Sequence, residues 1–294
     1  MDIHQLKSLV TIARCGTVAR AAELLHLSQP AVSAHVKQLE EELRVRLFER
    51  HARGMSLTAA GEAVFAHARR ALHAVDAIRD EANTLNGEVA GELVIGTVNE
   101  PAFLRLPAFL RHLREAAPQV AISLVQATSG AVLKNIEDGV FDAGYVEGRL
   151  EGLDVDATLL FPVEFVVAYP AAWQARVEAG GIAAALALPW IGTSDDCSFH
   201  RLTSALFAAH GRSFAPALRT DQESLLLEMV GQEAGLSLLR RDMLEAGAGG
   251  AVRALEGVVV EAGMYFVCAR SPAKPGLLRV AQRAMRRAWP AGLT

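Results

Sequence analysis

The stretch TVARAAELLHLSQPAVSAHVKQLEEEL, residues 17–43, decides the fold of the N-terminal part of the chain. Thr17 and Ser28 each precede a helical pattern that they can cap, and Pro30 falls in the first turn of the second helix, where a missing N–H costs little. Apolar residues at helical spacing give this second helix its buried face: Val32, Val36, Leu39 and Leu43. The pattern predicts two helices joined by a tight turn.

The flanking segments extend this pair of helices into a winged unit. An apolar stripe over residues 6–13 predicts a preceding helix that ends at Gly16. Two extended runs, 47–50 and 55–57, predict a hairpin, or wing, with Arg53 at its tip. The second helix of such a unit fits the major groove of DNA, and a wing arginine suits a phosphate or a narrow minor groove. The alternative is a small helical cap with a solvated hairpin.

A heptad pattern occupies the next segment. The segment from Thr58 to about Gly87 predicts one helix, about 43 Å long at 1.5 Å per residue. Pairing with a second copy of the chain is favoured, because a dimer has two DNA-binding units that can contact two half-sites on DNA. The alternative is an amphipathic helix packed on its own chain. The apolar positions recur at spacings of four and three, the seam of a paired helix: Val64, Ala68, Ala71, Val75, Ile78, Ala82 and Leu85.

The composition is that of a globular chain with about two domains' worth of residues. Of its 294 residues, 51% are hydrophobic and 21% are charged, which excludes a disordered or fibrous protein. The first residues lack a signal-peptide core, and the longest nearly apolar run, 180–192, is shorter than a bilayer span, so we expect a cytoplasmic location. The net charge is −4, but residues 1–60 hold eight Lys/Arg against six Asp/Glu, so a nucleic-acid contact is expected at that end.

The remaining chain alternates strand and helix patterns. Strand-like segments such as 93–98 are followed by helical ones such as 103–116, and a second set begins at 164–169. A late strand is expected at 264–269. This βαβ rhythm predicts a mostly parallel sheet with helices on both faces. Two sets with a hinge predict two lobes around a cleft, where ligands bind at the C-terminal ends of strands.

These segments resemble the LysR-type transcriptional regulators. The resemblance covers the whole chain, although the motifs after Gly61 are far weaker. It rests on six segments: Leu6-Lys7-Ser8-Leu9-Val10, Ala21-Ala22-Glu23-Leu24-Leu25, Leu27-Ser28-Gln29-Pro30-Ala31-Val32-Ser33, Leu39-Glu40-Glu41-Glu42-Leu43, Leu47-Phe48-Glu49-Arg50 and Leu57-Thr58-Ala59-Ala60-Gly61.

The resemblance implies a winged helix-turn-helix in residues 1–58, a dimerising linker helix in 59–88 and an effector-binding domain like a periplasmic binding protein in 89–294. In that fold the chain enters the second lobe near Phe161 and returns near Met264. The lobe bounds are 89–161 with 266–294 for lobe I, and 162–265 for lobe II. Such proteins form homodimers, usually paired into tetramers, and bind imperfect inverted repeats in promoters.

The resemblance also implies DNA contacts. Residues at the start of the second helix are expected to face base edges or the thymine methyl: Gln29, Pro30 and Ser33. Residues farther along this helix and in the wing are expected to face phosphate or the minor groove: Lys37, Arg50 and Arg53. Two positions depart from the family pattern. Ala34 stands where arginine is frequent and leaves only an apolar contact with a base. Arg44 stands where glycine is usual, so a turn with positive φ there would be strained.

The predicted cleft is lined by hydroxyls at strand ends, next to helix starts whose free N–H groups suit a carboxylate. Each hydroxyl could instead only cap its helix. Four match ligand-facing positions of the family, and seven other loop residues complete the predicted site: Thr97, Thr128, Thr193 and Ser194, with Asn99, Glu100, Ser129, Tyr145, His200, Arg201 and Asp221. Because acids outnumber bases in these loops, we expect an effector with both an acidic part and an amine or hydroxyl-rich part.

Other classes of function have weaker support in the sequence. Cys197 near His200 could make a redox-sensing regulator, but Cys15 and Cys268 offer no obvious resolving partner. Cys197 and His200 could also form half a metal site, for which no second half is present. An enzyme on the same fold would need a nucleophile–base pair or a cofactor loop, and the sequence shows neither. A small-molecule-binding protein of the secreted kind would share the two lobes but not the first 88 residues. We therefore expect no catalytic residues, no metal and no cofactor.

Overall fold

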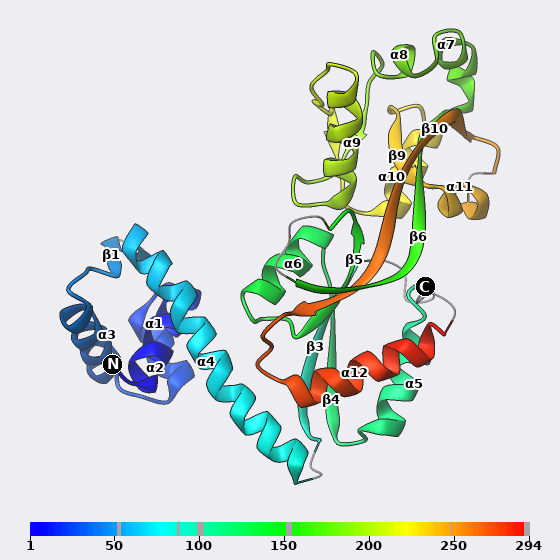
Figure 1. Cartoon of the computed structure of the whole chain (residues 1–294). Coiled ribbons are helices and arrows are strands. Elements are labelled where there is room, and N and C mark those ends of the chain that lie inside the picture. The colour runs from blue at the N-terminus through cyan, green and yellow to red at the C-terminus, as the bar shows by residue number, and fades with distance from the viewer. Residues whose placement is uncertain (52–53, 87–88, 99–102, 151–154, 248, 291–294) are drawn as a thin grey trace. The chain divides into compact units, whose positions relative to one another are not determined.

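Two units of structure divide the chain. The computed structural model describes residues 1–51, 54–86, 89–98, 103–150, 155–247 and 249–290 (Figure 1). The first unit comprises residues 1–90 with 271–279, and the second comprises 91–270 with 280–294. Among the described residues, no helix has the length and apolar character needed to cross a membrane.

The first unit starts with three capped helices. The Asp2 side chain accepts a hydrogen bond from the backbone N–H of Gln5, and the predicted caps Thr17 and Ser28 accept in the same way from Arg20 and Ala31. These side chains satisfy N–H groups that have no partner within a helix. The elements are α1 Ile3–Cys15, α2 Val18–Leu25, α3 Gln29–Leu43, β1 Phe48–His51, β2 Gly54–Leu57 and α4 Ala59–Leu85.

The core of this unit confirms the predicted buried face of α3. Val32 and Leu39 are fully buried and pack with Leu9 and Ile12 of α1. The hairpin β1–β2 is joined to this core because the backbone N–H of Met55 donates to the carbonyl of Gly16, at 2.7 Å. Together these elements form the helix-turn-helix and wing that the sequence predicts.

The turn after α3 has the left-handed conformation that glycine favours. Arg44 has a φ of 56° and donates its backbone N–H to the carbonyl of Glu40. A side chain in this region costs about 1–2 kcal/mol. Arg44, which stands where the family usually has glycine, is therefore strained, and the turn keeps the left-handed conformation.

The second unit is built on one six-stranded sheet of order β4-β3-β5-β10-β6-β9. Figure 1 shows β6 and β10 side by side as the long strands that join its two ends. The elements are β3 Gly91–Thr97, α5 Leu106–Ala116, β4 Val120–Gln126, α6 Ser129–Glu137, β5 Ala143–Gly148, β6 Val155–Pro170, α7 Gln174–Glu178, α8 Gly181–Ala185, β7 Ile191–Gly192, α9 Ser198–Ala209, β8 Leu218–Arg219, α10 Glu223–Gly231, β9 Ser237–Arg240, α11 Arg241–Gly247, β10 Val252–Ala269 and α12 Pro275–Ala288.

The expectation of a mostly parallel sheet is wrong. Strand β3 is parallel to β4 and β5, but β10 is antiparallel to β5 and β6, and β6 is antiparallel to β9. The expectation fails because it places short strands at 164–169 and 264–269. In the structure these segments belong to β6 and β10, which span 16 and 18 residues and pair antiparallel through most of their length. The two predicted crossing points, Phe161 and Met264, are partners in this ladder, next to a register shift between Met264 and Tyr265.

Candidate nucleic-acid interface and effector pocket

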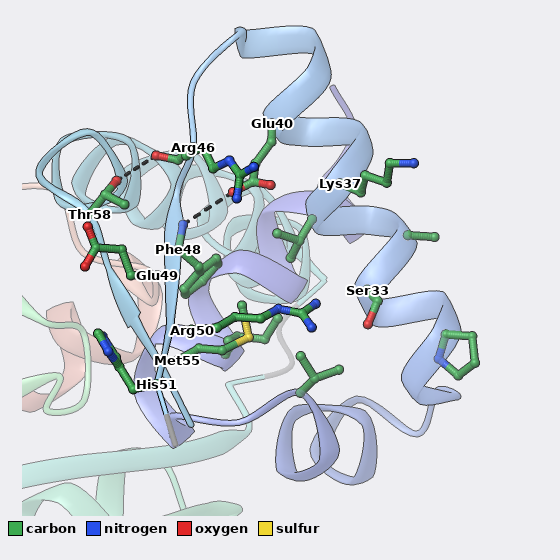
Figure 2. Close-up of a pocket in the computed structure, with 15 residues that line it drawn as sticks. Ser33, Lys37, Glu40, Arg46, Phe48, Glu49, Arg50, His51, Met55 and Thr58 are labelled. Atoms are coloured by element: carbon green, nitrogen blue, oxygen red, sulfur yellow. Dashed lines mark hydrogen bonds between the residues drawn. The ribbon is translucent and has the colours of Figure 1, made fainter. Parts of the chain in front are cut away.

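A groove of about 1030 Å³ separates the exposed side of α3 from the wing (Figure 2). Five of the seven predicted DNA-contacting residues line it: Pro30, Ser33, Ala34, Lys37 and Arg50. Gln29 is exposed in the first turn of α3 but does not line the groove, and Arg53 lies outside the described residues. The start of α3 therefore presents its polar and small side chains to the space beside the wing.

Three cations surround this groove, namely Lys37, Arg46 and Arg50. Figure 2 shows the Arg50 guanidinium reaching from β1 into the space between wing and helix, whereas Lys37 extends away from the wing. Lys37 Nζ lies 3.6 Å from a carboxylate oxygen of Glu41, and both side chains are exposed. Such a surface pair contributes little to stability, so it restrains the Lys37 side chain only weakly.

Two residues that the sequence reasoning missed hold the wing. The Glu40 carboxylate accepts hydrogen bonds from the backbone N–H groups of Leu47, at 2.7 Å, and Phe48, at 3.3 Å. The Thr58 hydroxyl donates to the carbonyl of Arg46 at 2.6 Å and accepts from the N–H of Gly61, which caps α4. Helical period and propensity give no sign of the contacts with residues 46–48, because these contacts join residues of different elements.

The predicted seam along α4 has a buried and an exposed part. Ala68 is 3% exposed and belongs to the core of its own chain, against which Val64 packs. Farther along, Ala71 and Ala82 are exposed and Val75 is half-buried. Two large apolar side chains on the seam are open to solvent: Ile78 is 71% exposed and Leu85 is 80% exposed.

A pocket of about 430 Å³ lies in the second unit, where strand ends meet the first turns of α6, α9 and α10. Four predicted effector-binding residues line it, and the other lining residues come from the same strand ends and helix starts. The lining consists of Thr128, Ser129, Thr193 and Asp221 from the prediction, with Val98, Gln126, Ala127, Glu147, Cys197, Ser198, Phe199, Gln222, Glu223 and Leu226.

Five other predicted residues are placed elsewhere. The Tyr145 ring is fully buried between Phe109 and Phe266, so Tyr145 belongs to the core, and burial raises the pKa of its hydroxyl. The other four do not line the pocket; they are Thr97, Ser194, His200 and Arg201. Two further predicted residues, Asn99 and Glu100, lie outside the described residues.

Hydrogen bonds cross from the first-lobe side of the pocket to the second. The Thr128 hydroxyl donates to the Asp196 carboxylate at 2.9 Å, and the N–H of Gly130 donates to the Asp196 carbonyl at 2.9 Å. The Ser194 and Thr128 hydroxyls together lower the pKa of Asp196, because both stabilise the carboxylate. Thr128 thus caps α6 and also links the two sides.

A buried arginine lies behind the pocket wall. Arg240 is 4% exposed, and its guanidinium lies 2.8 Å from Glu223, 3.0 Å from Asp242 and 3.7 Å from Glu147. Burial by itself would lower the pKa of Arg240, but these three carboxylates outweigh it and raise the pKa. The guanidinium also lies over the Phe103 ring, 4.1 Å from its centroid. Glu147 and Glu223 therefore face both this arginine and the pocket.

The environment of Cys197 disfavours a reactive thiolate. Burial raises the pKa of the Cys197 thiol, although the neighbouring Thr193 hydroxyl and the N–H of Phe199 oppose this shift. His200, the neighbour on which the redox alternative depends, lies 3.5 Å from the Asp195 carboxylate. Across the described ranges, no three His, Cys, Asp or Glu side chains lie close enough together to hold a metal ion.

Each unit matches a known family model. Residues 3–62 match the family model described as bacterial regulatory helix-turn-helix protein, lysR family, and residues 86–290 match the LysR substrate binding domain. The regulator IlvR of Caulobacter vibrioides is 30% identical over 243 residues, 81% of this chain and 82% of IlvR. The regulator ClcR of Pseudomonas putida is 34% identical over 145 residues, so the matched part spans about half the length of either chain, 49%.

Solved structures show the same fold. A full-length OxyR variant from Pseudomonas aeruginosa gives a TM-score of 0.70 at 23% identity, over 97% of this chain and 95% of that one. CbnR, described as a LysR family transcriptional regulator, gives a TM-score of 0.57 at 22% identity, over 98% and 99% of the two chains. The effector-domain model alone matches more than half of the sequence, and the helix-turn-helix model matches the N-terminal unit. The chain belongs to the LysR family.

Proposed function

We propose that the chain is a sequence-specific DNA-binding transcription regulator controlled by a small effector. The observation that carries this proposal is the start of α3, where Pro30, Ser33 and Ala34 line a groove that Arg50 enters. A helix placed in this way reads base edges in the major groove while cations beside it bind phosphate. Promoter DNA is then the partner, and the cytoplasm is the proposed location.

The exposed seam of α4 supports a homodimer. Ile78 and Leu85 leave large apolar surfaces in water unless a second helix covers them. Two copies paired through α4 present two α3 helices, which fits an imperfect inverted repeat. A dimer of such dimers completes the proposed assembly.

The pocket of the second unit is the proposed effector site. Its volume of about 430 Å³ suits a small metabolite, and its hydroxyls and helix starts supply polar contacts. A ligand that binds there changes DNA affinity only by the difference in its affinity for the two states of the protein, and DNA changes ligand affinity by the same factor. The proposal of a redox regulator has no comparable support, because burial raises the pKa of the Cys197 thiol.

In vitro selection from random duplex DNA with the full-length chain tests the DNA-binding proposal. We expect enrichment of an inverted repeat, and fluorescence anisotropy then measures affinity for that site and for a scrambled one. Arg50→Ala should weaken binding to both sites by a similar factor and reduce the salt slope by about one, because it removes a phosphate contact. Ser33→Ala should instead reduce the ratio between the two affinities. Failure to enrich any sequence would refute sequence-specific binding.

A further inference from the structure

Among the described residues that line the effector pocket, every charged side chain is a carboxylate. They are Glu147, Asp221 and Glu223, and no lysine, arginine or histidine appears among the described lining residues. One cation behind the wall, Arg240, faces three carboxylates with one guanidinium. The lining itself, as far as the described residues form it, therefore carries negative charge and no positive charge.

Glu147 is the most deeply buried of the three acids. Its side chain is 3% exposed, and Arg240, which it shares with Glu223 and Asp242, lies 3.7 Å from its carboxylate. A buried carboxylate is stable only when cations and hydrogen-bond donors compensate for lost hydration. A ligand with a positive charge would add to that compensation from the open side.

Thr193 independently indicates a missing polar partner. It is 2% exposed and lines the pocket, and its hydroxyl oxygen has no hydrogen-bond partner of ordinary geometry among the described residues, although the Cys197 thiol is a neighbour. Buried hydroxyl oxygens are nearly always hydrogen-bonded in proteins. The oxygen can accept a hydrogen bond from an N–H donor of a ligand.

We propose that this pocket selects an effector that carries an ammonium or guanidinium group, held by Glu147 and Asp221 with Thr193 as a further acceptor. The inference rests on the proposed role of the pocket as the effector site. The helices α9 and α10 have no side-chain cap at their N-termini, so a carboxylate elsewhere on the same ligand has a place to bind. A ligand with carboxylates alone meets three acids and is excluded.

Titration calorimetry on the full-length chain tests this charge preference with defined probes. L-arginine, L-lysine and putrescine are the cationic probes, and succinate, glutarate and benzoate are the anionic ones, all at millimolar concentration. We expect one or more cationic probes to bind and no anionic probe to bind. Binding of an anionic probe, or of none of the three cationic probes, would overturn the proposal.

Two isosteric variants locate the binding. Glu147→Gln and Asp221→Asn each remove one charge, and the amide oxygen at 221 can still accept the hydrogen bond that Asp221 accepts from the N–H of Ser194, at 2.7 Å. Each should weaken the cationic probe about 10- to 100-fold, the factor expected for one charged hydrogen bond. The matched control is Asp195→Asn, which removes an exposed acid outside the pocket and should leave affinity unchanged. Equal affinity in all three variants would refute the assignment.

The same samples separate this inference from the proposed function. Binding of each probe is compared with its effect on affinity for the selected DNA. A cationic probe that binds through Glu147 and leaves DNA affinity unchanged supports the charge preference and refutes the regulatory role. DNA binding that responds only to an anionic probe refutes the charge preference and supports the regulatory role.

Discussion

Removing the carboxylate of Glu40 should loosen the wing without unfolding α3. Glu40→Ala deletes the acceptor for two backbone N–H groups, those of Leu47 and Phe48, whose residues are buried in the core. A hydrogen bond to a charged group contributes about 1.5–3 kcal/mol, and the longer second bond contributes less than the first. We therefore expect the free energy of opening of the wing to fall by about 2–4 kcal/mol, which is a factor of about 30 to 1,000 in the opening equilibrium.

Native-state hydrogen exchange on the full chain measures this change directly. Amides of residues 47–51 should exchange faster by that factor in Glu40→Ala, whereas amides in the middle of α1 should keep their protection. Glu41→Ala is the control, because it removes a carboxylate from the adjacent, exposed position of the same helix. Unchanged exchange in the wing, or equal acceleration in both variants, would refute the role assigned to Glu40.

Three further changes test separate parts of the structure. Ile78→Glu should convert the dimer to monomer in sedimentation equilibrium, because it places a charge on the exposed seam, while Asn83→Glu beside the seam should leave the dimer intact. Arg44→Gly should raise the melting temperature of the first unit in calorimetry, because it relieves a left-handed residue that costs about 1 kcal/mol; a lower melting temperature would contradict this. Thr128→Val should raise the pKa of Asp196 toward its ordinary value in a carboxyl NMR titration, because it removes one hydrogen bond to the carboxylate. Since the pKa of Asp196 is lowered in the folded chain, this carboxylate stabilises the fold at pH values above the ordinary carboxyl pKa. That stabilisation is lost as the pH falls through the pKa of the folded chain.

The parts of the fold that the sequence predicted are those set by neighbouring residues. Thr17 and Ser28 cap helices through bonds to residues three positions ahead, so a short window of sequence contains the whole signal. The long strands β6 and β10 depend on pairing between segments far apart in the chain. Their outer halves carry no regular alternation of apolar and polar residues, so periodicity found only the ends near 164–169 and 264–269.

The pocket shows the same division between local and distant causes. Thr128, Thr193 and Asp221 were predicted because they follow strands, and strand ends gather at such a site. Tyr145 and Glu147 share one face of β5, and the sequence cannot tell that the first is enclosed by rings and the second reaches the pocket. The contacts of Glu147 with Arg240 are likewise invisible without the folded sheet.

The contacts at the foot of the wing bear on how DNA spacing is set. Thr58 caps α4 and donates to the carbonyl of Arg46, and Gly61 in the first turn lies so close to the carbonyl of Leu47 that a Cβ there would collide with it. These contacts hold the wing against the first turn of α4. On α3, the Glu40 carboxylate binds the backbone N–H of Leu47, so the wing, α3 and the start of α4 are held together. When two copies pair through α4, the distance between their α3 helices follows from the geometry of that pair, because these contacts join the reading head directly to the helix that carries the seam.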